Sequence, residues 1–150
     1  MKESEKIPPK LASWAECLEK QSSFKAYKDI ARARSVIETA LHRVKYINKD
    51  LNENTANFIF EDYYTSVLDI LEAITLLSGY KVLNHVCLGF YLRDILKRED
   101  LFRIFDELRF KRNSIVYYGK MMIFENAKLA INKSKTLMTA LENLLKEIPH

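Results

Sequence analysis

The sequence predicts an all-α protein, an antiparallel up-and-down four-helix bundle with an additional short helix. The chain contains only three prolines, and none of them lies between Lys10 and Ile148, so no proline interrupts a helix there. Glycines are equally few, and apolar residues recur at three- and four-residue intervals along most of the chain. A length of 150 residues suits one domain. We therefore expect residues 1–150 to form a single domain, with a flexible segment at 1–9.

Three helices are expected in the first half of the chain. The first covers residues 8–20, where prolines suit the first turn. The second covers 22–51 and begins at a serine cap, and its apolar stripe contains Phe24, Tyr27, Ile30, Ala31, Ile37, Leu41, Val44 and Ile47. The third covers 52–79, starting near Asn54 or Thr55 and ending at Gly79. Apolar residues lie on most sides of this helix, which indicates a central position, a subunit contact, or both.

Three further helices are expected in the second half. A short helix over 83–96 starts near Asn84. The next covers 98–119, with Asp100 near its positive end and Gly119 as its stop. The last covers 124–148 and has the most regular apolar period. Because the connections are short, neighbouring helices should pack antiparallel.

The charge, the cysteine content and the apolar runs of the chain limit the kinds of partner and site that we expect. Twenty-four basic and twenty acidic residues give a net charge of +4, which is compatible with a phosphate-bearing partner but is no nucleic-acid signature by itself. Cys17 and Cys87 are too few for a disulfide framework or a metal site, so we expect buried, reduced thiols. No apolar run approaches the ~20 residues of a membrane span. We expect a cytoplasmic protein that contacts no membrane and uses no metal or cofactor.

Several short patterns, taken in order, resemble a known family. They are "DYYTSVLDILEAITLLSGYKVLNHVCLGFYLRD" at 62–94, "LRFKRNSIVYYG" at 108–119, and the long closing helix. Over roughly residues 25–148 the chain resembles a HEPN domain (higher eukaryotes and prokaryotes nucleotide-binding). The resemblance implies a homodimeric four-helix bundle with an extra short helix. Members include metal-independent endoribonucleases and toxins, often encoded beside a minimal nucleotidyltransferase, as well as nucleotide binders and contact modules.

The nuclease members of that family carry an arginine, a polar residue and, four to six positions after the arginine, a histidine. On this chain the arginine corresponds to Arg112 and the polar residue to Asn113. The histidine position falls on Tyr117 or Tyr118, and no histidine lies in that window. If the protein is active, the catalytic residues are expected to be Arg112, Tyr117 and Tyr118.

Tyrosine in place of the histidine is expected to weaken RNA cleavage more than phosphate binding. A guanidinium is permanently charged and grips two phosphate oxygens. A tyrosine, with a pKa near ~10, is a poor base at neutral pH, although it donates hydrogen bonds and stacks on bases. Arg109, Asn113 and Tyr117 recur every four residues and share a helix stripe. The residues expected to bind phosphate or nucleic acid are Arg109, Lys111, Arg112, Asn113 and Lys120.

Three interpretations of the function stay open, beside a purely structural interpretation of the motif. The protein is expected to bind an RNA or nucleotide phosphate, as a homodimer through the third and fifth helices, within a toxin–antitoxin-like pair with a nucleotidyltransferase. Alternatively, it cleaves RNA with tyrosine in place of histidine, or it is a non-catalytic protein-interaction module. In a purely structural interpretation, Arg112 pairs with Glu61 or Asp62 and the two tyrosines are core or interface residues. His85, at a helix start, is interpreted as a helix-end hydrogen bonder.

Overall fold

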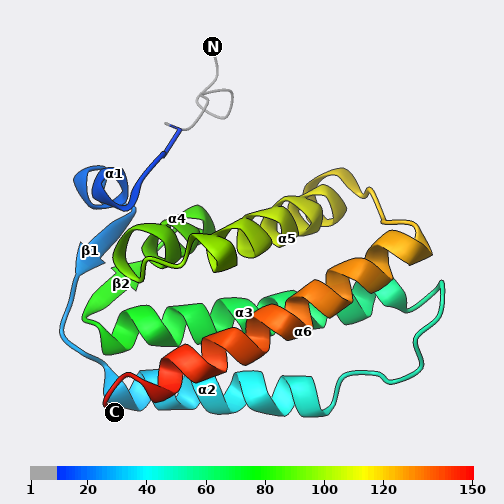
Figure 1. Ribbon diagram of the computed structural model, residues 1–150, viewed down its shortest axis with the longest axis horizontal. Coiled ribbons are helices and arrows are strands. Elements are labelled where there is room, and N and C mark those ends of the chain that lie inside the picture. The colour runs from blue at the N-terminus through cyan, green and yellow to red at the C-terminus, as the bar shows by residue number, and fades with distance from the viewer. Residues whose placement is uncertain (1–9) are drawn as a thin grey trace.

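The computed structural model describes residues 10–150, and helices dominate it (Figure 1). The all-α bundle predicted from the sequence is confirmed. The flexibility expected for residues 1–9 concerns a segment outside the described residues. In chain order the elements are α1 (Trp14–Glu19), β1 (Ser23–Lys25), α2 (Ile30–Lys45), α3 (Ala56–Leu77), β2 (Tyr80–Val82), α4 (His85–Phe90), the π-helical turn η2 (Tyr91–Ile95), α5 (Glu99–Tyr118) and α6 (Phe124–Lys146).

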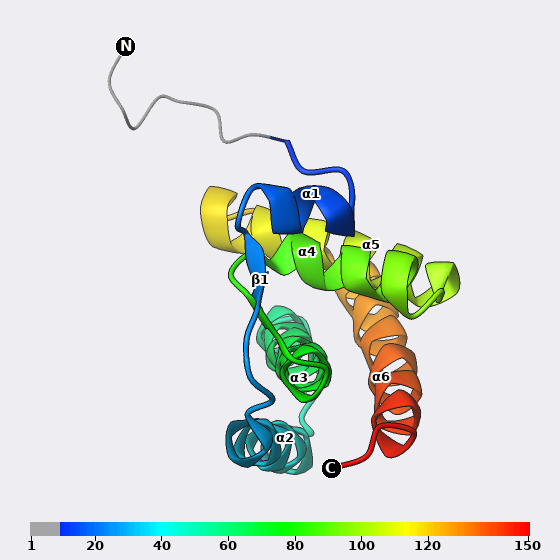
Figure 2. The same cartoon turned by 90° about the vertical axis from the view of Figure 1, so that its left-hand side faces the viewer.

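The helix α3 lies at the centre of the molecule. Helices α2, α3, α5 and α6 alternate in direction (Figure 1), and α3 lies between α2 on one side and the α4–α5 layer on the other, with α6 alongside (Figure 2). The largest fully buried side chains include Phe60, Tyr64, Ile70, Leu71 and Ile74, all from α3. A helix that is apolar on several sides therefore occupies the position that covers it on several sides.

The second helix begins later than its apolar stripe predicted. It starts at Ile30, after the Asp29 side chain accepts a hydrogen bond of 3.1 Å from the backbone N–H of Arg32. Phe24 lies instead in β1 and pairs with Lys81 of β2, while Tyr27 is 80% exposed in the connection to α2. The extended chain leaving α3 supplies backbone hydrogen-bond partners to residues 22–26, and this long-range pairing outweighs local helical periodicity.

The predicted helix ends at four positions are confirmed. Thr55 precedes α3, and Gly79 follows it with a positive φ of 84°. Asn84 caps α4 through a side-chain oxygen that accepts from the N–H of Val86 at 3.1 Å. Gly119 ends α5 with φ 62°, a left-handed conformation that glycine adopts without strain.

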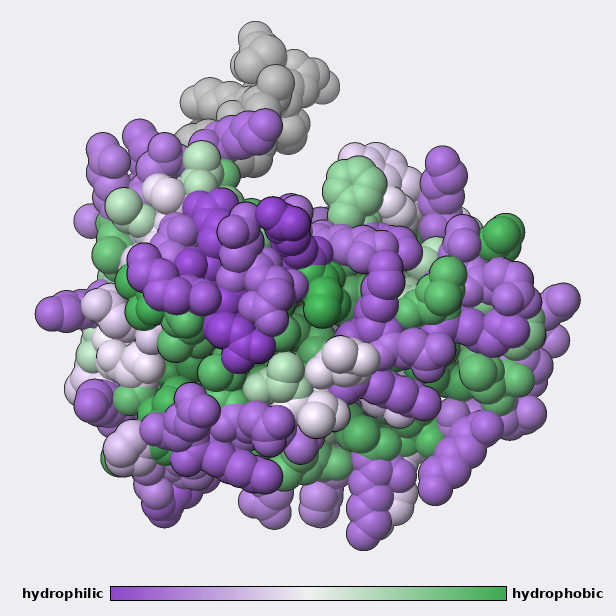
Figure 3. Space-filling model, in the orientation of Figure 1, coloured by the Kyte–Doolittle hydropathy of each residue, from purple (hydrophilic) through white to green (hydrophobic). Residues whose placement is uncertain are grey.

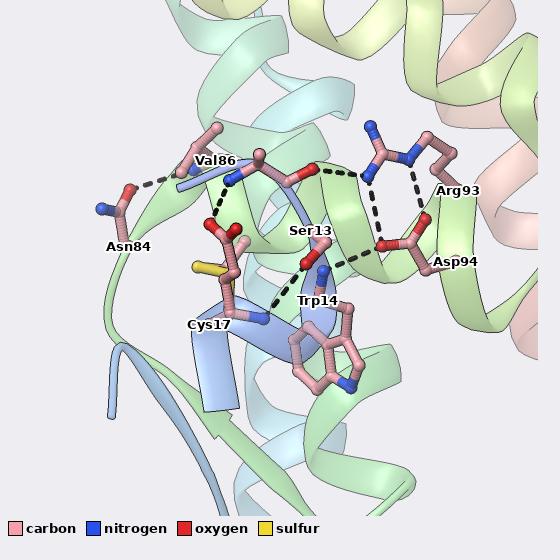
Figure 4. The surroundings of a disulfide bond; sticks show 10 residues. Ser13, Trp14, Cys17, Asn84, Val86, Arg93 and Asp94 are labelled. Carbon is pink, nitrogen blue, oxygen red and sulfur yellow. Dashed lines mark hydrogen bonds and ion pairs between the residues drawn. A yellow bond between two sulfur atoms is a disulfide. The ribbon is translucent and has the colours of Figure 1, made fainter. Parts of the chain in front are cut away.

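The expectation of reduced thiols is wrong, because Cys17 of α1 and Cys87 of α4 form a disulfide with their Cα atoms 6.1 Å apart (Figure 4). The pairing crosses 70 residues, so no local spacing signals it. Packing of α1 on the bundle brings the cysteines together. The Trp14 ring meets Tyr80 and Tyr91 edge-on, with centroids 5.3 and 5.0 Å away, and the backbone N–H of Trp14 donates to Asp94 at 2.8 Å.

Across residues 10–150, no helix has both the length and the apolar character that crossing a membrane requires.

Candidate functional site

A polar pocket of about 260 Å³ lies between the start of α4 and the C-terminal half of α5. Its walls combine residues from two distant parts of the chain: Leu83, Asn84, His85 and Val86 on one side, and Arg109, Arg112, Asn113 and Tyr117 on the other. Among the residues that the structure describes, no carboxylate lines it. The combination of two arginines, an amide and an imidazole makes it a candidate site for an anion.

A glycine lets the two walls approach each other. A Cβ atom on Gly89 would lie 3.0 Å from a ring carbon of Phe105 and 3.3 Å from ring carbons of Phe102, both on α5. The first turn of α4 is further held by the disulfide at Cys87. Together these contacts fix His85 opposite the arginines of α5.

The guanidinium of Arg112 faces this pocket without a partner of opposite charge among residues 10–150. With the residues 10–150 that the structure describes, it forms no ion pair and no side-chain hydrogen bond, so pairing with Glu61 or Asp62 is absent there. Its central carbon lies over the Tyr64 ring, 5.7 Å from the centroid, and the side chain is only partly exposed. A cation resting on an aromatic face keeps all its N–H donors for a ligand.

Arg109 contributes less free charge than Arg112. It donates to Oδ1 of Asp106 from Nη2 at 2.9 Å and from Nε at 3.2 Å, in an ion pair three residues apart on α5. The aspartate orients the guanidinium and neutralises part of its charge. Arg112 is therefore the stronger anchor for an anion.

The ring of Tyr64 lies beneath the guanidinium of Arg112. Its side chain is fully buried and stacks on Phe105 with centroids 6.1 Å apart, and its hydroxyl has no hydrogen-bond partner among the described residues. Burial raises the pKa of Tyr64 to about 12, although the nearby Arg112 and Arg109 act in the opposite direction. The phenol therefore stays neutral at physiological pH.

His85 lies in the pocket without performing the helix-capping role that the sequence suggested for it. The Asn84 side chain caps α4 instead, and the imidazole of His85 remains accessible. Burial lowers the pKa of His85, and the charges of Arg112 and Arg109 lower it further. The imidazole is consequently neutral at pH 7 and has a free nitrogen lone pair.

The structure brings together four of the expected site residues: Arg109, Arg112, Asn113 and Tyr117. Lys111 lies outside the pocket and binds Glu107 at 3.3 Å, on the side of α5 where Lys133 of α6 binds the same carboxylate. Tyr118 and Lys120 also lie outside the pocket, and both are exposed. Residues one position apart on a helix point about 100° apart, which explains why Lys111 and Tyr118 diverge from their neighbours.

Leu83, Asn84, His85 and Val86 are the pocket residues that sequence reasoning missed. Helical periodicity shows which α5 residues share a face but not what covers that face. The one available signal was the "NH" pair at the start of the short helix, within the stretch that carries the family resemblance.

Apolar side chains surround the exposed end of α5. Tyr117 is 70% exposed and Tyr118 is 80% exposed, so neither is a core residue. Figure 3 shows apolar residues breaking the polar surface over the region where α5 ends and α6 begins. The exposed large side chains of this stretch are Phe110, Val116, Tyr117, Tyr118, Met121 and Ile123.

The described residues contain no cluster of three or more His, Cys, Asp or Glu side chains placed to hold a metal ion. No protein-family model, curated protein or solved structure matches this chain.

Proposed function

We propose that the protein is a HEPN-like domain that binds an RNA or nucleotide phosphate in the pocket between α4 and α5. The observation that carries this proposal is the guanidinium of Arg112: within residues 10–150 it has no ion-pair partner, and no carboxylate from those residues lines its pocket. A phosphate placed there would receive charge-assisted hydrogen bonds from Arg112 and additional attraction from Arg109.

Tyr117 supports a nucleotide over a simple anion. Its phenol ring lines the pocket and is largely exposed. An exposed ring beside a phosphate site offers a nucleobase a stacking surface, and such stacking is worth about 1–3 kcal/mol per base. Asn113 adds an amide that donates and accepts hydrogen bonds.

The wider proposal has two further parts: a homodimer, and a pairing with a minimal nucleotidyltransferase in a toxin–antitoxin-like system. The exposed apolar end of α5 is available for contact with another chain. Sedimentation at micromolar concentration tests the homodimer, and a monomeric protein in that experiment would refute it.

A cytoplasmic location completes this proposal and has a direct test. Disulfides are rare in reducing compartments. Trapping thiols in intact cells before lysis therefore bears on the location, because a Cys17–Cys87 bond formed in the cell would argue for an oxidising compartment. Free thiols at that point would agree with the cytoplasm.

Fluorescence anisotropy with a labelled single-stranded RNA tests the binding proposal. Arg112→Ala removes at least one charge-assisted hydrogen bond, worth about 1.5–3 kcal/mol, so the Kd should rise by at least roughly 10- to 150-fold. Arg103→Ala is a matched control, because Arg103 is an exposed arginine of the same helix paired with Glu99 and lies outside the pocket. Its Kd should change less than about threefold.

This titration, together with a check of the same RNA for cleavage, separates the rival functions. Equal binding by the Arg112→Ala and Arg103→Ala proteins would refute the pocket as the phosphate site. If RNA does not bind at all, the protein-interaction module becomes the better proposal. Cleavage that depends on Tyr117 or Tyr118 would support the endoribonuclease with tyrosine in place of histidine.

A further inference from the structure

We propose that His85 is the proton acceptor of an RNA-cleaving reaction at this pocket, supplied by α4 instead of by the α5 motif. This inference rests on the proposed phosphate site and assigns that site a reaction. It replaces the interpretation in which a tyrosine of α5 takes the role of the absent histidine.

The placement of His85 is the first argument. Its imidazole and the guanidinium of Arg112 line one pocket, although 26 residues of chain separate them. Three independent features hold that wall of the pocket: the cap at Asn84, the disulfide at Cys87 and the close contact at Gly89. A base must be held in place relative to the phosphate it serves, and these three contacts restrain this segment of α4.

The protonation state of His85 is the second argument. The charged groups that act on it are Arg112 and Arg109 of α5, which disfavour the imidazolium, and Glu72 of α3, which favours it more weakly. Burial of the imidazole has the largest effect and lowers the pKa of His85, and the two arginines add to it. Burial beside these guanidiniums thus favours the form of the imidazole that accepts a proton.

The proposed reaction is a transesterification that needs no group beyond the RNA, water and this pocket. His85 accepts the proton of a ribose 2′-hydroxyl while the 2′-oxygen attacks the adjacent phosphorus. The bond from phosphorus to the 5′-oxygen breaks, and that oxygen takes a proton from water. The products are a 2′,3′-cyclic phosphate and a 5′-hydroxyl end, and the imidazolium returns its proton to solvent. Arg112 and Arg109 stabilise the charge on the non-bridging oxygens.

A DNA oligonucleotide with one internal ribonucleotide and a 5′-fluorescein label tests the inference in the presence of EDTA. Cleavage is expected at the ribonucleotide alone, leaving a cyclic phosphate. The rate should rise with pH through a value below 6.5 and then level off, as expected for a base whose pKa is lowered. His85→Asn should cleave at least about 100-fold more slowly, and its pH-dependent limb should disappear.

Binding is measured in parallel with the same oligonucleotide carrying a 2′-O-methyl group, which cannot be cleaved. His85→Asn should bind it within about threefold of the wild-type protein, and Arg112→Ala should bind it more weakly. His42→Asn is the matched control for both assays, because His42 lies on α2 away from the pocket and should change neither value.

The outcomes separate the two proposals. Arg112-dependent binding without cleavage, or cleavage unchanged in His85→Asn, overturns the role of His85 and leaves phosphate binding intact. If binding does not depend on Arg112, the proposed function fails and this inference fails with it. Cleavage of the all-DNA oligonucleotide would overturn a mechanism that requires the 2′-hydroxyl.

Discussion

Reducing the Cys17–Cys87 bond should cost the protein a large part of its folding free energy. The bond closes a loop with a sequence separation of 70. Closing a loop of that length removes about 14.8 cal/mol/K of chain entropy from the unfolded state, or about 4.4 kcal/mol at 25 °C. Domains of this size are stable by about 5–15 kcal/mol, so reduction should remove a substantial fraction.

Urea unfolding of the oxidised and reduced protein measures this difference directly. The two forms share every side chain, so the comparison avoids the cavities that substitution of two buried residues would create. We expect a lower midpoint for the reduced protein, together with a larger m-value because its unfolded chain exposes more surface. A thiol assay in denaturant should find no free thiols before reduction and two afterwards.

Two results would refute this reasoning. Two free thiols in protein purified without reductant would mean that the bond does not form. An unchanged unfolding free energy after complete reduction would mean that the unfolded chain is already restricted to a similar extent. The double substitution of Cys17 and Cys87 by alanine serves as a second comparison, since it should show the same loss plus a contribution from lost packing.

Two further perturbations follow from the contacts around the pocket. Gly89→Ala places a methyl group 3.0 Å from Phe105, so we expect a loss of about 1–2 kcal/mol in thermal or urea unfolding and weaker RNA binding as α4 moves away from α5; unchanged stability would show that the rings yield freely. Tyr64 has a pKa raised to about 12 in the folded state against about 10 when unfolded, so stability should fall by up to roughly 3 kcal/mol as pH rises from 10 to 12, where only the unfolded chain has lost the proton. Tyr64→Phe should remove the Tyr64 contribution and leave a smaller decline, because burial also raises the pKa of Tyr63 and of Tyr91. An identical pH dependence in the variant would contradict the assignment.

The sequence predicted the helical fold and the helix ends because those features depend on local chemistry. Gly79 and Gly119 act through a positive φ, Asn84 through a side-chain cap, and Thr55 through a side-chain oxygen that accepts from the N–H of Asn52 in the turn before α3. The central position of α3 followed from an apolar surface too wide for one neighbour.

The features that sequence reasoning missed are those that depend on distant partners. Phe24 fits a helical stripe and yet lies in a strand, because residues near Gly79 are available to pair with it. Cys17 and Cys87 meet only because α1 packs across the bundle. For the same reason, the α5 side of the pocket was predictable and His85 was not.

The disulfide divides the chain into a closed ring and an open tail. Residues 17–87 form a covalent ring that contains α2 and α3, whereas α5 and α6 follow it in the chain and are held to it by non-covalent contacts. A protease cut in the connection between α2 and α3 would release no separate fragment until the bond was reduced. The pocket straddles this division, with His85 on the ring and Arg112 on the tail. Separation of the tail from the ring would therefore dismantle the pocket while leaving the ring closed.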